Sequence, residues 1–247
     1  MPETLGPMST FAVLGIGLLF GLKHATEVDH VVAVSTIVSR HRNVWHSSLV
    51  GALWGTGHTA SLLIIGIFVL TLRIAIPERV SNWLEFCVAL MIIGLGATAL
   101  WRALRQRGDV HVHKHSHDGV SHTHVHFHEA QTKHNEHRAH THAVSQIGIK
   151  PILIGAMHGL AGSGALTLLV LTQIRSTWQG LLYLGVFGVG SIAGMLLMSG
   201  LIGVPFALTS RNLTGLHHRL QAAAAVFSLA FGFWYAYEVL VTSVLTP

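Results

Sequence analysis

The stretch GLKHATEVDHVV, residues 21–32, places two histidines and two carboxylates inside an otherwise apolar part of the chain. They are His24, Glu27, Asp29 and His30. Imidazole nitrogen and carboxylate oxygen together form a donor set that divalent transition metals accept. A charged side chain at the centre of a membrane-spanning helix costs about 2.5–3.5 kcal/mol on insertion scales, so such groups usually serve a function. The spacing therefore predicts an intramembrane metal site.

Two later histidines in apolar surroundings are candidates for the same site. His58 lies in GTGHTASL, where small neighbours let another helix approach closely, so we expect it to bind the metal or to support a ligand. His158 lies in GAMHGLAGSGALT, without carboxylates nearby in the sequence. It is a weaker candidate ligand.

The first motif does not converge on a regular helix. At 100° per residue, His24, Glu27 and His30 share a broad face, whereas Asp29 points away. We therefore predict that the first membrane helix is locally broken at the motif, aided by the glycines upstream. A structural alternative stays open, in which Lys23 neutralises Glu27 across one helical turn and Asp29 pairs with a neighbouring histidine.

The sequences around His24 and His58 both recur later in the chain, at nearly the same distance in residues. GLKHATEVDHVVA aligns with GAMHGLAGSGALT at an offset of 134 positions, which places His24 over His158. GTGHTASL aligns with GVGSIAGM at an offset of 133, which places His58 over Ser191. Two three-helix halves are implied. Because each half has an odd number of spans, the halves have opposite orientations, as in the inverted repeats of many secondary transporters.

Composition identifies the elements that position these residues as membrane helices. Of 247 residues, 51% are hydrophobic and 10% are charged, against about 25% charged in soluble domains. Apolar windows long enough to cross the bilayer predict an all-α polytopic membrane protein with six transmembrane helices. The windows are residues 9–39, 45–72, 82–106, 147–174, 180–207 and 218–244.

The distribution of Lys and Arg predicts the orientation. Eleven lie in or beside loops 40–44, 107–146 and 208–217, whereas three lie on the other side and Lys23 lies within a span. The positive-inside rule then places both termini outside and the long loop in the cytoplasm of a multi-pass cell-membrane protein. The cations form no basic groove interleaved with aromatics, so no nucleic-acid partner is expected.

The chain divides into a first half at 1–106, a loop at 107–146 and a second half at 147–247. Twelve of the chain's 20 histidines lie in this loop, which by composition cannot build a packed core and is predicted to be disordered. It is a plausible weak, auxiliary binder of transition metals. Its histidines are His111, His113, His115, His117, His122, His124, His126, His128, His134, His137, His140 and His142.

Three motifs resemble those of the nickel/cobalt transporter family. HATEVDH is similar to the family's H-x4-D-H motif, WGTGHTASLL resembles the G-H-[ST] motif of its next helix, and GAMHGLAGSGALTLL resembles the second-half motif of its urease-accessory-type nickel permeases. The resemblance implies that His24, Asp29 and His30 select the metal and that His58 contributes. Two departures are the absence of the extra span that many members carry before the motif helix, and a His-rich loop that is also found in nickel/cobalt exporters.

The resulting hypothesis is a secondary transporter that moves Ni²⁺, or Co²⁺, across the membrane, with uptake favoured by the membrane potential. No G-x4-G-K-[ST] phosphate loop occurs, so ATP hydrolysis by this chain is not expected, and no cofactor is implied. Cytoplasmic partners would be nickel-handling proteins of urease or hydrogenase maturation.

Three other functions share some of these sequence features. Efflux of nickel or cobalt uses the same ligands with the opposite direction. A zinc-type cation/proton exporter usually relies on H-x3-D or D-x3-D pairs across two helices rather than on H-x4-D-H. An intramembrane metalloenzyme is disfavoured, because H-E-x-x-H is missing and the helices hold too few histidines for a diiron oxygenase. We therefore expect a transporter rather than an enzyme.

Overall fold

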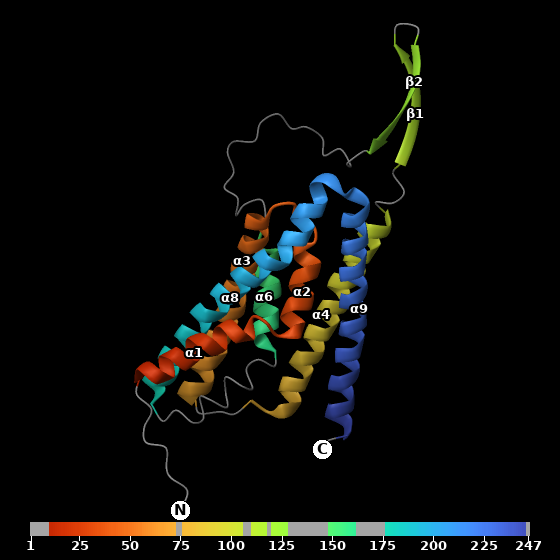
Figure 1. Cartoon of the computed structure of the whole chain (residues 1–247). Coiled ribbons are helices and arrows are strands. Elements are labelled where there is room, and N and C mark those ends of the chain that lie inside the picture. The colour runs from red at the N-terminus through yellow and green to blue at the C-terminus, as the bar shows by residue number, and fades with distance from the viewer. Residues whose placement is uncertain are drawn as a thin grey trace, which may run out of the picture.

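A computed structural model describes residues 10–72, 76–105, 110–117, 120–127, 148–161 and 176–245. Within these ranges it contains seven helices and one two-stranded hairpin (Figure 1). The helices are α1 (Thr10–His24), α2 (Val28–Val38), α3 (Val44–Leu72), α4 (Glu78–Arg105), α6 (Lys150–Leu160), α8 (Thr177–Asn212) and α9 (Thr214–Leu245).

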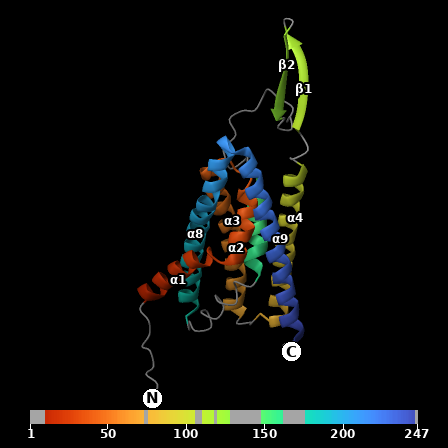
Figure 2. The ribbon, with the colours of Figure 1, turned by 45° about the vertical axis from the view of Figure 1, so that its right-hand side comes forward.

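The helices alternate in direction along the chain. In Figures 1 and 2, α2, α4 and α8 run toward the end of the bundle where α8 turns into α9, which we call the upper end. Helices α3, α6 and α9 run the opposite way, toward the lower end, where α4 begins. Helix α1 crosses the lower half obliquely before the chain turns upward into α2.

Four helices are long and apolar enough to cross a membrane, namely α3, α4, α8 and α9. Large apolar side chains on their outer faces are exposed, among them Phe68, Trp83, Leu197 and Phe233. In water this surface would be unfavourable, but in a bilayer it faces lipid. The described residues therefore form the helical bundle of a multi-pass membrane protein.

The first apolar window is two helices and not one, which confirms the predicted break. Helix α1 ends at His24, and the next residues form tight turns, with Thr26 N donating to Lys23 O at 2.9 Å and Glu27 N to His24 O at 3.1 Å. Glu27 is extended, with ψ 146°, and α2 starts immediately after it. In the fourth window the structure describes α6, whereas residues 162–175 lie outside the described residues.

Helix α2 occupies the centre of the bundle and contacts α3, α4, α8 and α9. Its apolar face, including Val32 and Val38, packs with Trp54 of α3 and Ile92 of α4. A second apolar cluster joins α3 to α8 through Leu62 and Phe187. The short helix that carries the second half of the motif is thus held on several sides.

Four of the glycines allow close helix contacts that matter for the arrangement of the site. A Cβ on Gly57 of α3 would overlap the backbone oxygen of Ile152 in α6, and one on Gly155 would overlap that of Trp54. Between α1 and α8, a Cβ on Gly21 would overlap the backbone oxygen of Phe187, and one on Gly190 would lie 2.5 Å from that of Leu18. Small residues at these positions therefore let α3 meet α6, and α1 meet α8, backbone to backbone.

The His-rich loop contains the hairpin. Strands β1 (Val110–His117) and β2 (Val120–Phe127) pair antiparallel, with His111 opposite His126 and His115 opposite His122. In each strand the histidines recur at every second position, a period that suits an extended strand. This periodicity accounts for regular pairing without a packed core. The loop's remaining histidines, His128, His134, His137, His140 and His142, lie outside the described residues.

Candidate metal site

The break between α1 and α2 brings the sequence motif together in space. His24 is the last residue of α1, and Asp29 and His30 lie in the first turn of α2. His58 comes from the middle of α3, and His158 from the last turn of α6. All four histidines are buried, with exposed fractions of 5% for His24, 1% for His30, 0% for His58 and 2% for His158.

Three imidazoles form the core of the cluster. The ligand atoms of His24, His30 and His58 all lie within 4.8 Å of one another. His24 Nε2 and His58 Nε2 are 3.0 Å apart, so at most one of these two atoms carries a proton. Nε2 of His30 is buried and has no hydrogen-bond partner among the described residues. An unpaired buried nitrogen is costly unless a ligand satisfies it.

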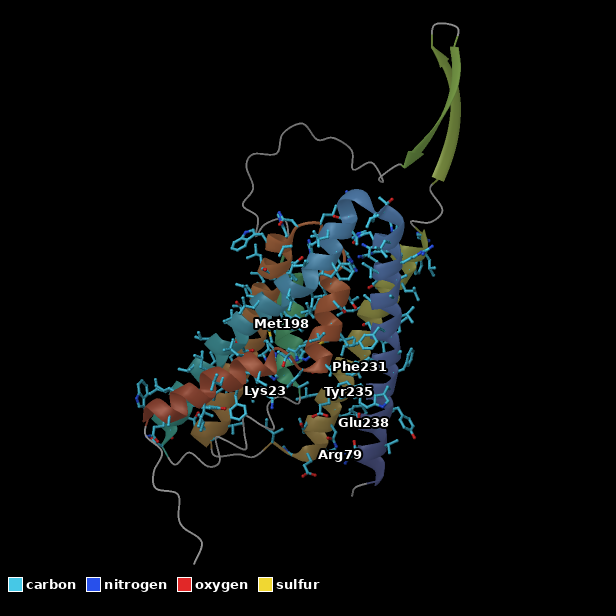
Figure 3. All side chains as sticks on the ribbon, viewed as in Figure 1. Lys23, Arg79, Met198, Phe231, Tyr235 and Glu238 are labelled. Atoms are coloured by element: carbon cyan, nitrogen blue, oxygen red, sulfur yellow. The ribbon has the colours of Figure 1, made fainter. Side chains whose placement is uncertain are left out.

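The two carboxylates of the motif contact the opposite side of these rings. His24 Nδ1 lies 2.9 Å from a Glu27 oxygen, and His30 Nδ1 lies 2.9 Å from an Asp29 oxygen. Because a carboxylate only accepts, each Nδ1–H is the donor and each Nε2 keeps its lone pair. Carboxylates commonly orient metal-binding histidines in this way. Glu27 therefore pairs with His24 and not with Lys23, whose exposed side chain lies at the end of α1 (Figure 3).

Asp29 has a second histidine partner from the other end of the sequence. His158 Nε2 donates to the other Asp29 oxygen at 2.9 Å, so this carboxylate bridges His30 and His158. Asp29, His30 and His158 form a second group with metal-ligand spacing. All six residues predicted for the site are thus brought together. The seven loop histidines from His111 to His126 that the structure describes lie in β1 and β2.

Aromatic residues that sequence reasoning missed support the rings. Trp54 stacks on His30, with centroids 5.6 Å apart and planes at 15°, and its edge meets His158 at 5.6 Å. Phe187 packs against His24 at 5.5 Å. The available signal was the repeat, because the 133-residue offset places Phe187 over Trp54.

Long apolar helices around a buried cluster of histidines and carboxylates define a multi-pass membrane protein with a candidate transition-metal site. The chain is 36% identical over 231 residues to the urease accessory protein UreH of Bacillus sp. (strain TB-90), covering 94% of this chain and 93% of that protein. The chain therefore belongs to the family of the urease accessory protein UreH.

A more distant similarity is to the chloroplast protein FOR GROWTH AND FERTILITY 1 of Arabidopsis thaliana. It is 23% identical over 218 residues, which covers 87% of this chain but 56% of that protein. No family model and no solved structure matches the chain.

Proposed function

We propose that this protein is a nickel permease of the cell membrane, with Co²⁺ as an alternative substrate. The observation that carries the proposal is the set of three buried imidazoles whose ligand atoms lie within 4.8 Å of one another, among helices long and apolar enough to cross a membrane. Nitrogen donors favour borderline transition metals over Mg²⁺ and Ca²⁺. The resemblance of HATEVDH to the nickel/cobalt motif and the kinship with a urease accessory protein support nickel in particular.

In this proposal, Nε2 atoms of His24, His30 and His58 bind the ion. Two nitrogens that bind one ion at a right angle, at about 2.1 Å each, lie about 3 Å apart. The 3.0 Å separation of His24 Nε2 and His58 Nε2 fits such a pair. Glu27 and Asp29 then hold the rings by their Nδ1 atoms and offset the charge of the ion.

We further propose that the two halves are inverted repeats. Gly21 contacts Phe187, and the repeat aligns these two residues with Gly155 and Trp54, which also contact each other. Gly57 contacts Ile152, and the repeat aligns these two residues with Gly190 and Leu18, which are in contact as well. Two independent close approaches thus recur as equivalent pairs, which is what a pseudo-two-fold relation produces.

Transport would follow from movement of one half against the other around this site. Uptake is the proposed direction, because the membrane potential favours entry of a cation. The lower end would then face outside, and the His-rich loop would receive the ion in the cytoplasm for nickel-handling proteins. Efflux would use the same site, with the loop collecting surplus metal.

The experiment is uptake of radioactive nickel into vesicles that contain the purified protein. We expect His24→Ala and His58→Ala to reduce flux at least tenfold, because each removes a nitrogen donor. His46→Ala is the matched control, since His46 lies on α3 near the upper end, outside the cluster. Undiminished flux in both cluster variants would contradict the site, and higher nickel content in cells lacking the protein would indicate efflux.

A further inference from the structure

A cavity of about 460 Å³ lies beside the histidine cluster, between α2, α4, α6 and α9. Asp29 and His158 of the cluster line it, and so do Glu85 of α4 and Glu238 of α9. The proposed function does not use Glu85 or Glu238, and no sequence motif relates these two residues to each other.

The cavity is strongly acidic for a space within a membrane bundle. Four carboxylates line it, those of Glu27, Asp29, Glu85 and Glu238, and no Lys or Arg is among its described lining residues. Glu85 is close enough to Asp29 and Glu238 to be repelled by both. In the part of the chain that the structure describes, the Glu85 and Glu238 carboxylates have no ion-pair or hydrogen-bond partner. Because uncompensated charge is costly there, a cation is the complementary occupant.

A buried histidine of the cluster lies on the inner wall of the cavity. His158 is 2% exposed, lines the cavity and has no partner for its Nδ1 among the described residues. Exposure differs along the wall, because Glu238 is exposed, the Glu27 side chain is 41% exposed, Glu85 is half-buried and the Asp29 side chain is 23% exposed. The cavity is therefore open near Glu238 and closed at the histidines.

The outer carboxylates lie toward the lower end. Phe231, Tyr235 and Glu238 follow one another along α9 in that direction (Figure 3), and all three line the cavity. Their spacing of four and three residues places them on one helix face. Glu85 lies two turns from the start of α4, at the same end. Carboxylate oxygen is thus found on the outer side and imidazole nitrogen on the inner side.

We propose that Glu85 and Glu238 form an outer site that attracts a hydrated divalent cation before the histidines bind it. The inference rests on the proposed function in one respect, that the inner cluster receives the same ion. Carboxylates hold hydrated hard cations without removing all their water, so the outer site binds divalent cations with little selectivity. Selection then occurs at the imidazoles. Negative charge in a narrow cavity also raises the local cation concentration.

Terbium luminescence tests the outer site without requiring transport. Tb³⁺ prefers oxygen ligands, and Trp234, which lines the cavity, can transfer excitation to it. In neutral detergent, we expect the full-length protein to give sensitised Tb³⁺ emission that Glu85→Gln/Glu238→Gln reduces at least fivefold. Emission should be unchanged in Glu78→Gln, because Glu78 lies on α4 but does not line the cavity.

Emission that persists in the double variant would overturn the outer site, and so would emission lost equally in His58→Ala, since the ion would then occupy the inner cluster. Because Glu238 is exposed, the single variant Glu238→Gln should fold normally and show a partial loss. Unchanged emission in that folded variant would exclude Glu238.

Nickel flux separates this proposal from the function on which it rests. We expect the double variant to raise the half-saturating nickel concentration roughly 3–10-fold while the maximal rate stays constant, because capture weakens and the inner ligands remain. A lower maximal rate with unchanged half-saturation would contradict the role in capture. No flux in the wild type would reject the permease, while the terbium result would still decide the outer site.

Discussion

Asp29 accepts three hydrogen bonds within the cluster. One oxygen accepts from His30 Nδ1 and the other from His158 Nε2, each at 2.9 Å. Its first oxygen also accepts from the backbone N of His30 at 2.9 Å, at the positive end of α2. The residue therefore fixes two rings and one helix start at once.

Asp29→Asn should weaken nickel binding about 10–100-fold while the fold is retained. The amide keeps the shape of the side chain, but one negative charge is lost. Its NH₂ group also replaces an oxygen that accepted a hydrogen bond from an imidazole N–H, so two donors face each other. The measurement is nickel-dependent thermal stabilisation of the purified protein, with Glu78→Gln as the control. Equal stabilisation in wild type and Asp29→Asn would show that Asp29 does not orient the ligands.

Residue types, spacing and the sequence repeat were sufficient to nominate the six residues that the structure brings together. They could not indicate that each motif carboxylate contacts an Nδ1 atom, because that depends on the geometry of the turn between His24 and Val28. They also could not relate Glu85 and Glu238 to the site, since helices α4 and α9 meet it only through tertiary packing.

At the scale of elements, backbone contacts between helices hold the cluster in place. His58 follows Gly57, whose missing side chain lets α6 approach, and α6 carries His158. The glycines upstream of the motif were expected to aid the break, but Gly21 instead contacts α8, and the break lies after His24. A sequence repeat locates such glycines, but it does not distinguish a packing role from a flexible one.

Gly57→Ala should destabilise the bundle by about 1–3 kcal/mol, because the new Cβ overlaps the Ile152 backbone, which cannot move aside like a flexible side chain. Gly190→Ala, its partner in the repeat, should have a comparable effect. The control is Gly94→Ala in α4, where a Cβ has open space. Thermal unfolding in detergent measures all three, and a loss as large in Gly94→Ala would refute the packing argument.

At the scale of the whole molecule, the two ends of the bundle are chemically different. The upper end carries the hairpin and the turn from α8 to α9, whereas the cavity carboxylates lie toward the lower end (Figure 1). Hydropathy was sufficient to predict the long helices α3, α4, α8 and α9, because each is a continuous apolar run. It could not show how α1 and α2 divide one window, because the break depends on polar contacts.

The proposed orientation predicts opposite labelling of the two ends in intact cells. In a Cys87→Ser background, Arg79→Cys at the lower end should react with an impermeant maleimide, since Arg79 is exposed (Figure 3). Gly215→Cys at the upper end should react only after the cells are opened, because the positive-inside rule places that end in the cytoplasm. The reverse pattern would invert the topology and, with it, the side from which the cavity admits cations.

The single hydrogen bond between Asp29 and His158 has an energetic consequence for transport. In the proposed division into halves, His24, His30 and His58 all belong to the first half, so a rigid movement of one half against the other would leave their separations unchanged and would break this bond. A hydrogen bond to a charged group contributes about 1.5–3 kcal/mol. A membrane voltage of 100 mV supplies about 2.3 kcal/mol for each elementary charge. The electrical work on one dication is therefore comparable to the contribution of this one bond, which is one of four side-chain hydrogen bonds that join residues 1–106 to residues 147–247 among the described residues.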